Sequence, residues 1–444
     1  MLKDTRRRLS RLMILIVVAV TATRALGAMT SSVENLNIQD GLSNNYVTAV
    51  VQDKRGEIWV GTEAGLNRFN GHDFMSFTVG DIGLPGDAVT ALQYDSKHDR
   101  LWVGTKSGLC VIQLPDQTPV ELKKPADMGD YNITDITPAS DGGLWIVNHY
   151  GSVTHYNPES EKFTVYNVKN VPGLPNEMLT AGDDGYGNLL IGHFTDGLSV
   201  VDMKTRSLRR YTSDPSNPAS LPGNRVRIIR PDSFNNIWVG TSNGLGRFDV
   251  RSGRFTTFRH ISGDPGSLAG DAVYAVTETP DGTLWIGTDI GGVSCIPVRD
   301  IAATDSGRAP VFSNIIVTND GHGVSSKNIR SIFNDSYGNM WIGNFSSGLD
   351  FIPHRQPPFR KTQYFEFVGN GARTKPVWSL LSEANGNIWA GSENEIALFN
   401  GGKLIRTIDL TPYLTRAYDR IEDLTAIGDK ILIGLDNNGV LELG

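Results

Sequence analysis

The chain consists largely of short apolar runs in a repeating order. The run Val47–Gln52 (VTAVVQ) is rich in β-branched residues, which favours a strand buried on both faces. The turn sequence DKRG follows it, and two further strands are predicted at 57–62 and 66–70. Asn70-Gly71 is a strong hairpin signal that leads into a fourth strand at 74–78. This order predicts four antiparallel strands in about 45 residues.

The same unit recurs along the chain. The phrase at 58–62 (IWVGT) has eight counterparts, and the glycine positions of successive copies lie 43 to 56 residues apart. Repetition of a four-stranded unit at this period predicts a β-propeller. We expect the tryptophans to pack between adjacent blades, and the glycine after each to let neighbouring backbones approach closely. The counterparts start at Leu101, Leu144, Leu189, Ile237, Leu284, Met340, Ile388 and Ile431.

The first repeat is preceded by an unpaired strand. Residues 35–45 align with 77–87, which end a fourth strand and lead into the next blade. We therefore expect Leu36–Ile38 to complete the blade of the seventh copy by pairing near Leu349–Ile352, which removes exposed sheet edges. A proline-rich stretch, PHRQPPF at 353–359, follows that copy.

These signals predict an all-β fold with two parts. The first is a seven-bladed β-propeller of four-stranded antiparallel blades at 33–353, and the second, at 357–444, is the first two blades of an incomplete second propeller. A single ring of eight or nine blades is the alternative.

The N-terminus has the features of an export signal. Arginines at 6, 7, 8 and 11 precede the apolar run LMILIVVAV at 12–20, and small residues at 25–28 offer a cleavage site. A membrane anchor is the alternative, but Arg24 interrupts the apolar run before it reaches about 20 residues. We predict a cleaved signal peptide at 1–28 and a periplasmic protein, which contacts a membrane only through an uncleaved signal or a partner.

Charge and motifs narrow the function. The 41 basic and 48 acidic residues give a net charge of −7 without a basic stripe, which argues against nucleic-acid binding. The sequence contains none of the common nucleophile or metalloprotease motifs, so we predict no catalytic residues, no metal site and no cofactor. A protein-interaction scaffold, and a propeller lyase or glycan-active enzyme that uses scattered His and Tyr side chains, remain alternatives.

The phrases at 41–47 (GLSNNYV) and 53–69 (DKRGEIWVGTEAGLNRF) resemble two-component regulator propeller repeats. The resemblance implies the periplasmic sensor region of a hybrid two-component histidine kinase, in which two seven-bladed propellers precede an immunoglobulin-like domain, a membrane helix and the kinase. Many such sensors respond to products of glycan breakdown. We expect a truncated or split sensor here, without its kinase part. It would function as a homodimer or with a kinase-bearing partner chain.

A ligand site is expected on one face of the propeller. The loops that enter the first strand of each blade and the loops that join its second and third strands should emerge together. Most copies carry small residues in the latter loops, but three copies carry polar and aromatic ones, which suit an oligosaccharide or another small polar ligand. Ordinary variation among surface loops is the alternative. The candidate residues are His149, Tyr150, His193, Phe194, Asp196 and Phe345.

Overall fold

The computed structural model describes two compact units, which are treated separately below. The units are Met1–Arg355 and Gln356–Gly444. The predicted signal peptide lies outside the described residues. Described are 33–354 except 130, 303–309 and 319–322, then 365–368, 371–374, and 376–444 except 384, 402, 417 and 429.

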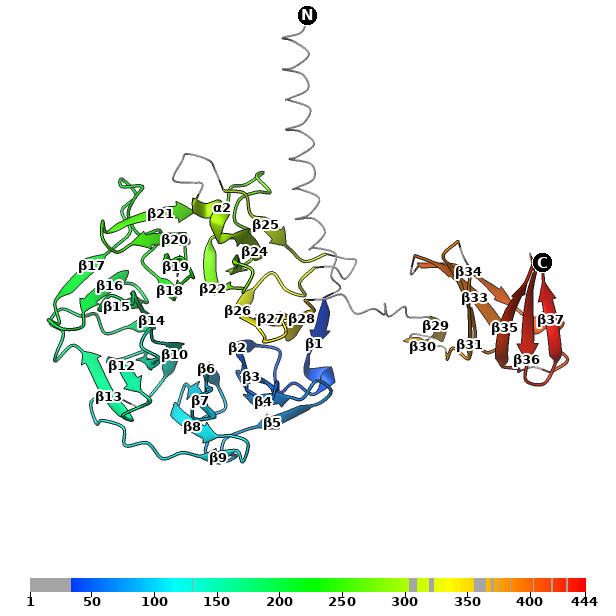
Figure 1. The fold of residues 1–444 in the computed structure, drawn as a ribbon, viewed down its shortest axis with the longest axis horizontal. Coiled ribbons are helices and arrows are strands. Elements are labelled where there is room, and N and C mark those ends of the chain that lie inside the picture. The colour runs from blue at the N-terminus through cyan, green and yellow to red at the C-terminus, as the bar shows by residue number, and fades with distance from the viewer. Residues whose placement is uncertain are drawn as a thin grey trace, which may run out of the picture. The chain divides into compact units, whose positions relative to one another are not determined.

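Seven four-stranded antiparallel sheets make up the described part of the first unit (Figure 1). Each sheet is one blade, and in the first six blades the strands run outward from the ring axis in chain order. Blades 1 to 3 contain β2 (Val47–Gln52), β3 (Ile58–Thr62), β4 (Gly65–Phe69) and β5 (Phe74–Phe77); β6 (Val89–Asp95), β7 (Arg100–Thr105), β8 (Gly108–Gln113) and β9 (Thr118–Pro119); and β10 (Ile133–Pro138), β11 (Leu144–Asn148), β12 (Ser152–Asn157) and β13 (Lys162–Asn167).

The remaining blades repeat this plan. Blades 4 and 5 contain β14 (Met178–Asp183), β15 (Asn188–His193), β16 (Leu198–Asp202) and β17 (Leu208–Tyr211), then β18 (Val226–Pro231), β19 (Ile237–Thr241), β20 (Gly244–Asp249) and β21 (Arg254–Phe258). Blade 6 contains β22 (Ala272–Glu278), β23 (Thr283–Asp289), β24 (Gly292–Pro297) and β25 (Ser313–Ile315), with the short helix α2 (Val298–Ala302) after β24. Blade 7 contains β26 (Ile329–Asn334), β27 (Met340–Asn344), β28 (Leu349–Ile352) and β1 (Glu34–Leu36).

The innermost strands form a closed circle. Each of β2, β6, β10, β14, β18, β22 and β26 contacts the next, and β26 contacts β2. Figure 1 shows these strands around the ring axis, from blue through green to yellow. The predicted all-β propeller fold is confirmed. Among the described residues, no helix has the length and apolar character needed to cross a membrane.

Strand β1 completes blade 7, as the alignment of the N-terminal segment predicts. Glu34 lies opposite Phe351 and Leu36 opposite Leu349 in an antiparallel pair with β28. The strand ends earlier than expected, because Asn37 caps a 3-10 turn at Ile38–Asp40 instead of extending it. The Asn37 side chain accepts a hydrogen bond from the backbone N–H of Gln39 at 2.9 Å.

The tryptophans fill the spaces between blades, as predicted. Trp59 is fully buried and packs in one cluster with Leu66 of its own blade and with Val89 and Leu101 of blade 2. The glycine that follows two residues later allows this close approach, because a Cβ on Gly61 would lie 2.5 Å from Cγ1 of Val89. Five of the first unit's tryptophans occupy equivalent interblade clusters: Trp102, Trp145, Trp238, Trp285 and Trp341.

In blades 1, 5 and 7 the turn after the innermost strand supplies a hydrogen-bond acceptor for the indole. In blade 5, Asp232 accepts from Nε1 of Trp238 at 2.9 Å and also from backbone N–H groups of its own turn. Blade 3 has Ala139 at this turn position, and its Trp145 instead donates to Asp183 of blade 4 at 2.7 Å. This hydrogen bond therefore joins two blades.

The second unit, described by itself, contains a hairpin and two sheets. Its strands are β29 (Phe365–Val368) and β30 (Gly371–Thr374); β31 (Ser379–Ser382), β32 (Asn387–Gly391), β33 (Glu395–Asn400) and β34 (Lys403–Asp409); and β35 (Ile421–Ile427), β36 (Lys430–Leu435) and β37 (Gly439–Leu443), with a 3-10 turn at Thr411–Tyr413. Trp389 and Ile421 centre its main core. Several large apolar side chains are exposed, including Leu380 at 66% and Val440 at 65%.

We expect limited proteolysis to cut the second unit first. A blade without neighbours on both faces buries less apolar surface, and this lowers its local free energy of unfolding. Digestion followed by mass spectrometry should leave a resistant fragment that ends near residue 355. Equal resistance of both units, with a single unfolding transition, would contradict this expectation.

Candidate functional site

The predicted site residues come from loops on one face of the propeller, and backbone hydrogen bonds join these loops. In blades 3, 4 and 7 the residue after the second strand donates its backbone N–H to the residue before the innermost strand, so the two kinds of loop do emerge together. We call this side the entry face. The donor and acceptor pairs are His149 and Asn132, Phe194 and Glu177, and Phe345 and Asn328, at 2.9 to 3.0 Å.

Three of the predicted residues form a contact group on blades 3 and 4. The ring centroids of His149 and Tyr150 lie 4.2 Å apart, and those of His149 and Phe194 lie 6.2 Å apart. The guanidinium carbon of Arg225 lies 3.9 Å from the centroid of Phe194, which extends the group to blade 5. Tyr150 is 52% exposed and is therefore accessible to a ligand.

His193 and Asp196 have other partners. The His193 ring is fully buried, with Nε2 2.8 Å from the Ser199 hydroxyl and Nδ1 3.3 Å from the Glu177 carbonyl. Burial lowers its pKa to about 4, so the ring is neutral at pH 7. It holds the loop and is not available at the surface. Asp196 accepts a hydrogen bond from Arg210 of β17 at 2.8 Å, toward the outer strand.

Phe345 belongs to a second group, on blades 7 and 1. Its ring centroid lies 4.7 Å from that of Tyr46 and 4.7 Å from the guanidinium carbon of Arg330. Arg330 also lies over the ring of Tyr274, at 4.1 Å, and Arg227 approaches the same ring at 4.1 Å.

Two sets of contacts extend from blade 4 to blade 7, one that ends at Arg225 and one that begins at Arg227, two positions further along the chain. We call the two sets together the entry arc. Three of its members occupy the same position of their innermost strands, where the register with the second strand shifts by one residue. The sequence analysis did not select these three, although alignment of the innermost strands would have revealed them. The entry arc consists of Phe194, Arg225, Arg227, Tyr274, Arg330 and Phe345.

Blades 1 to 3 carry threonine at the equivalent position. The hydroxyl of Thr48 donates to the Val89 carbonyl at 2.8 Å, and Thr134 donates to Met178 at 3.3 Å, so each ties its blade to the next. Thr90 makes the same bond to Ile133. The position can therefore join blades without any charge.

Positive charge dominates the entry arc. Arg330 pairs with Asp289 at 3.2 Å, whereas Arg225 and Arg227 form no ion pair within the part of the chain that the structure describes. The Arg227 side chain is partly buried, and its Nε has no hydrogen-bond partner there. Burial is the main cause that lowers the pKa of Arg227; the charges of Arg225 and Arg330 also lower it, whereas Tyr274 and Asp289 act in the opposite direction.

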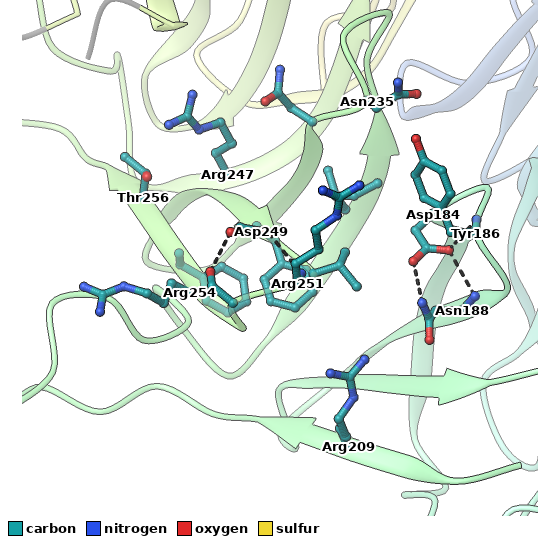
Figure 2. Close-up of a pocket in the computed structure, with 16 residues that line it drawn as sticks. Asp184, Tyr186, Asn188, Arg209, Asn235, Arg247, Asp249, Arg251, Arg254 and Thr256 are labelled. Carbon is teal, nitrogen blue, oxygen red and sulfur yellow. Dashed lines mark hydrogen bonds between the residues drawn. The ribbon is translucent and has the colours of Figure 1, made fainter. Parts of the chain in front are cut away.

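A groove of about 890 Å³ lies on the opposite face, between the turns of blades 4 and 5, where the sequence predicted no site. Figure 2 shows that the guanidinium groups of its four labelled arginines spread apart instead of converging. The Asp184 carboxylate already accepts hydrogen bonds within its own turn, from the backbone N–H groups of Tyr186 and Asn188 and from the Asn188 side chain. The groove is therefore an open surface whose charged groups do not converge on one point.

Comparison with known proteins identifies the repeats. A family model described as "Two component regulator propeller" matches residues 41–64, 220–243, 267–289 and 323–346. These segments are two component regulator propeller repeats. They correspond to blades 1, 5, 6 and 7, and they contain five members of the entry arc.

Solved structures and curated proteins include relatives of these repeats. The extracellular domain of a putative hybrid two component system from B. thetaiotaomicron is 26% identical, with a TM-score of 0.63, over 93% of this chain and 53% of its own. Histidine kinase P4 of Formosa agariphila is 53% identical over 38 residues, which are 9% of this chain and 3% of that protein.

A virginiamycin B lyase from Staphylococcus aureus shares the propeller fold. It is 15% identical, with a TM-score of 0.51, over 72% of this chain and 98% of its own. At this identity the likeness concerns the fold alone. The chain spans about half the length of the two component system domain that it resembles.

Proposed function

We propose that this chain is a ligand-sensing propeller of a two-component regulatory system and that it acts outside the cytoplasm. The ligand is an oligosaccharide of the size released by glycan breakdown, bound on the entry face and not chemically changed. A kinase-bearing segment or partner chain carries the signal onward. Support comes from the regulator propeller repeats and from the likeness to extracellular domains of such systems.

One observation carries the proposal of ligand binding. His149, Tyr150 and Phe194 come from two blades and lie together on the entry face, next to the Arg225 guanidinium. Exposed aromatic rings bind the apolar faces of sugars, and neighbouring polar groups bind the hydroxyls. Aromatic rings at this loop position are not needed for the fold, because blades 1, 2 and 5 have Glu63, Lys106 and Ser242 there.

We expect Tyr150→Ala and Phe194→Ala each to weaken oligosaccharide binding by about 1–3 kcal/mol, as for an anchor residue at an interface. The melting temperature should change little, because both rings lie outside the interblade cores. Isothermal titration with a panel of neutral and acidic oligosaccharides measures the affinity, and mass spectrometry of the mixture detects turnover.

Tyr186→Ala is the matched control, because Tyr186 is 72% exposed and lies in the groove of the opposite face. It should leave the affinity unchanged. Unchanged affinity in the Tyr150 and Phe194 double variant would exclude this part of the entry face. Turnover of any probe would favour an enzyme, and absence of binding to every probe would favour a protein-interaction scaffold.

A further inference from the structure

The entry arc has more positive than negative charge in a partly buried setting. Arg225 and Arg227 belong to blade 5 and Arg330 to blade 7, with Tyr274 of blade 6 between Arg227 and Arg330, and Asp289 pairs with Arg330. Several arginines elsewhere in the propeller have close carboxylate partners, among them Arg55, Arg100 and Arg210. Arg55 pairs with Asp53 and Asp99, and these pairs need no external ion.

Arg227 shows the imbalance most clearly. Its guanidinium carbon lies 4.1 Å from the centre of the Tyr274 ring, a cation–π contact. Its Nε is buried without a hydrogen-bond partner among the described residues. A buried donor without a partner, together with like charges nearby, destabilises the ligand-free protein. A ligand that accepts a hydrogen bond from this Nε removes the energetic penalty.

The fold does not need an arginine at position 227 to join adjacent blades. At the same strand position, Thr48, Thr90 and Thr134 donate to carbonyl groups of the next blade. A short neutral side chain can therefore join adjacent blades at this position. The arginines of blades 5 and 7 depart from this pattern on the half of the ring that carries the entry arc.

We propose that the entry arc binds an anionic oxygen group of an acidic oligosaccharide, a carboxylate or a sulfate ester, between Arg225 and Arg227. Guanidinium groups bind such anions through paired N–H donors, which ammonium groups cannot match in geometry. Phe194 and Tyr274 stack against the two arginines and position their guanidinium groups. This inference rests on the proposed function and specifies the class of its ligand.

The first experiment compares probes of equal length on the full chain. Isothermal titration with tetragalacturonate, a κ-carrageenan tetrasaccharide and neutral galactotetraose separates carboxylate, sulfate and neutral ligands. We expect one of the two acidic probes to bind at least about tenfold more tightly than the neutral one. Its affinity should fall between 50 and 200 mM NaCl, because salt screens charge.

The second experiment uses variants. Arg227→Thr introduces the residue type of blades 1 to 3, and we expect it to weaken acidic-probe binding at least about tenfold without lowering the melting temperature. Arg225→Gln should weaken the same binding. Lys97→Gln removes one positive charge far from the entry face, where Lys97 pairs with Glu159, and should have no effect.

The outcomes separate this inference from the proposed function. Equal binding of neutral and acidic probes, or unchanged acidic-probe affinity in Arg227→Thr, overturns the inference and leaves oligosaccharide sensing in place. Arg251 lines the groove of the opposite face. Weakened acidic-probe binding in Arg251→Gln but not in Arg227→Thr assigns the anion to that groove and also overturns the inference. Absence of binding by all three probes at about 1 mM overturns both.

Discussion

Trp59→Ala should destabilise the first unit by about 3–5 kcal/mol, the usual cost of emptying a buried aromatic site. Trp59 is fully buried between blades 1 and 2, so its removal leaves a cavity that two rigid sheets cannot close. The substitution also removes the indole N–H that Asp53 accepts at 3.2 Å. Urea unfolding followed by tryptophan fluorescence and circular dichroism measures the change.

Met75→Ala serves as the control for this prediction. Met75 lies on β5 of the same blade and is 49% exposed, so its truncation should change the free energy of unfolding by less than about 0.5 kcal/mol. If Trp59→Ala cost no more than Met75→Ala, the tryptophans would not be the main interblade contacts.

Asp183→Ala should cost about 2–4 kcal/mol, because it breaks charge-assisted hydrogen bonds in a buried setting. The carboxylate accepts from Nε1 of Trp145 at 2.7 Å and from the backbone N–H groups of Ser140 and Gly185 at 3.0 Å. Two of these donors belong to blade 3, so the substitution should weaken the contact between blades 3 and 4. Thermal unfolding at pH 7 tests this expectation.

The same carboxylate gives the stability a pH dependence. Burial alone would raise the pKa of Asp183, but the hydrogen bonds from Ser140 and Trp145 outweigh it and hold the pKa below 3.8. A lowered folded-state pKa adds stability above the unfolded-state value, and that contribution is lost as the pH falls through the folded-state value. The stability difference between wild type and Asp183→Asn should therefore shrink below about pH 4. A difference that grew in acid would contradict the assignment.

The repeat pattern predicted much of the fold because each copy states the same local rules. The strands of blade 1 match their predicted ranges within one residue, and the interblade tryptophans and the pairing of β1 are confirmed. The strand boundary at Ile38 was wrong, because the cap formed by Asn37 stops the strand.

The site was harder to predict because it depends on differences among copies. Loop residues that break the consensus led to the choice of His149, Tyr150, Phe194 and Phe345 as candidates, and the same reasoning selected His193, whose side chain is fully buried. Arg227 and Arg330 lie in the innermost strands, at register shifts, whereas the sequence analysis compared only the loops between second and third strands. Blade 3 has Ala139 where other blades have an acceptor, and its Trp145 donates to Asp183 of blade 4 instead. The sequence of one repeat alone cannot show this contact between two repeats.

The pairing of β1 with β28 also constrains the time course of folding. Asn35 and Asp350 are hydrogen-bonded although 315 residues separate them in sequence, so this contact closes one of the longest loops in the chain. Contacts of high sequence separation slow folding, because the entropy of the intervening chain is lost before the contact stabilises it. Until β1 pairs with β28, the outer edge of β28 exposes unpaired N–H and C=O groups. A folding intermediate with six finished blades and an open seventh is therefore the species most prone to pair with a strand of another molecule.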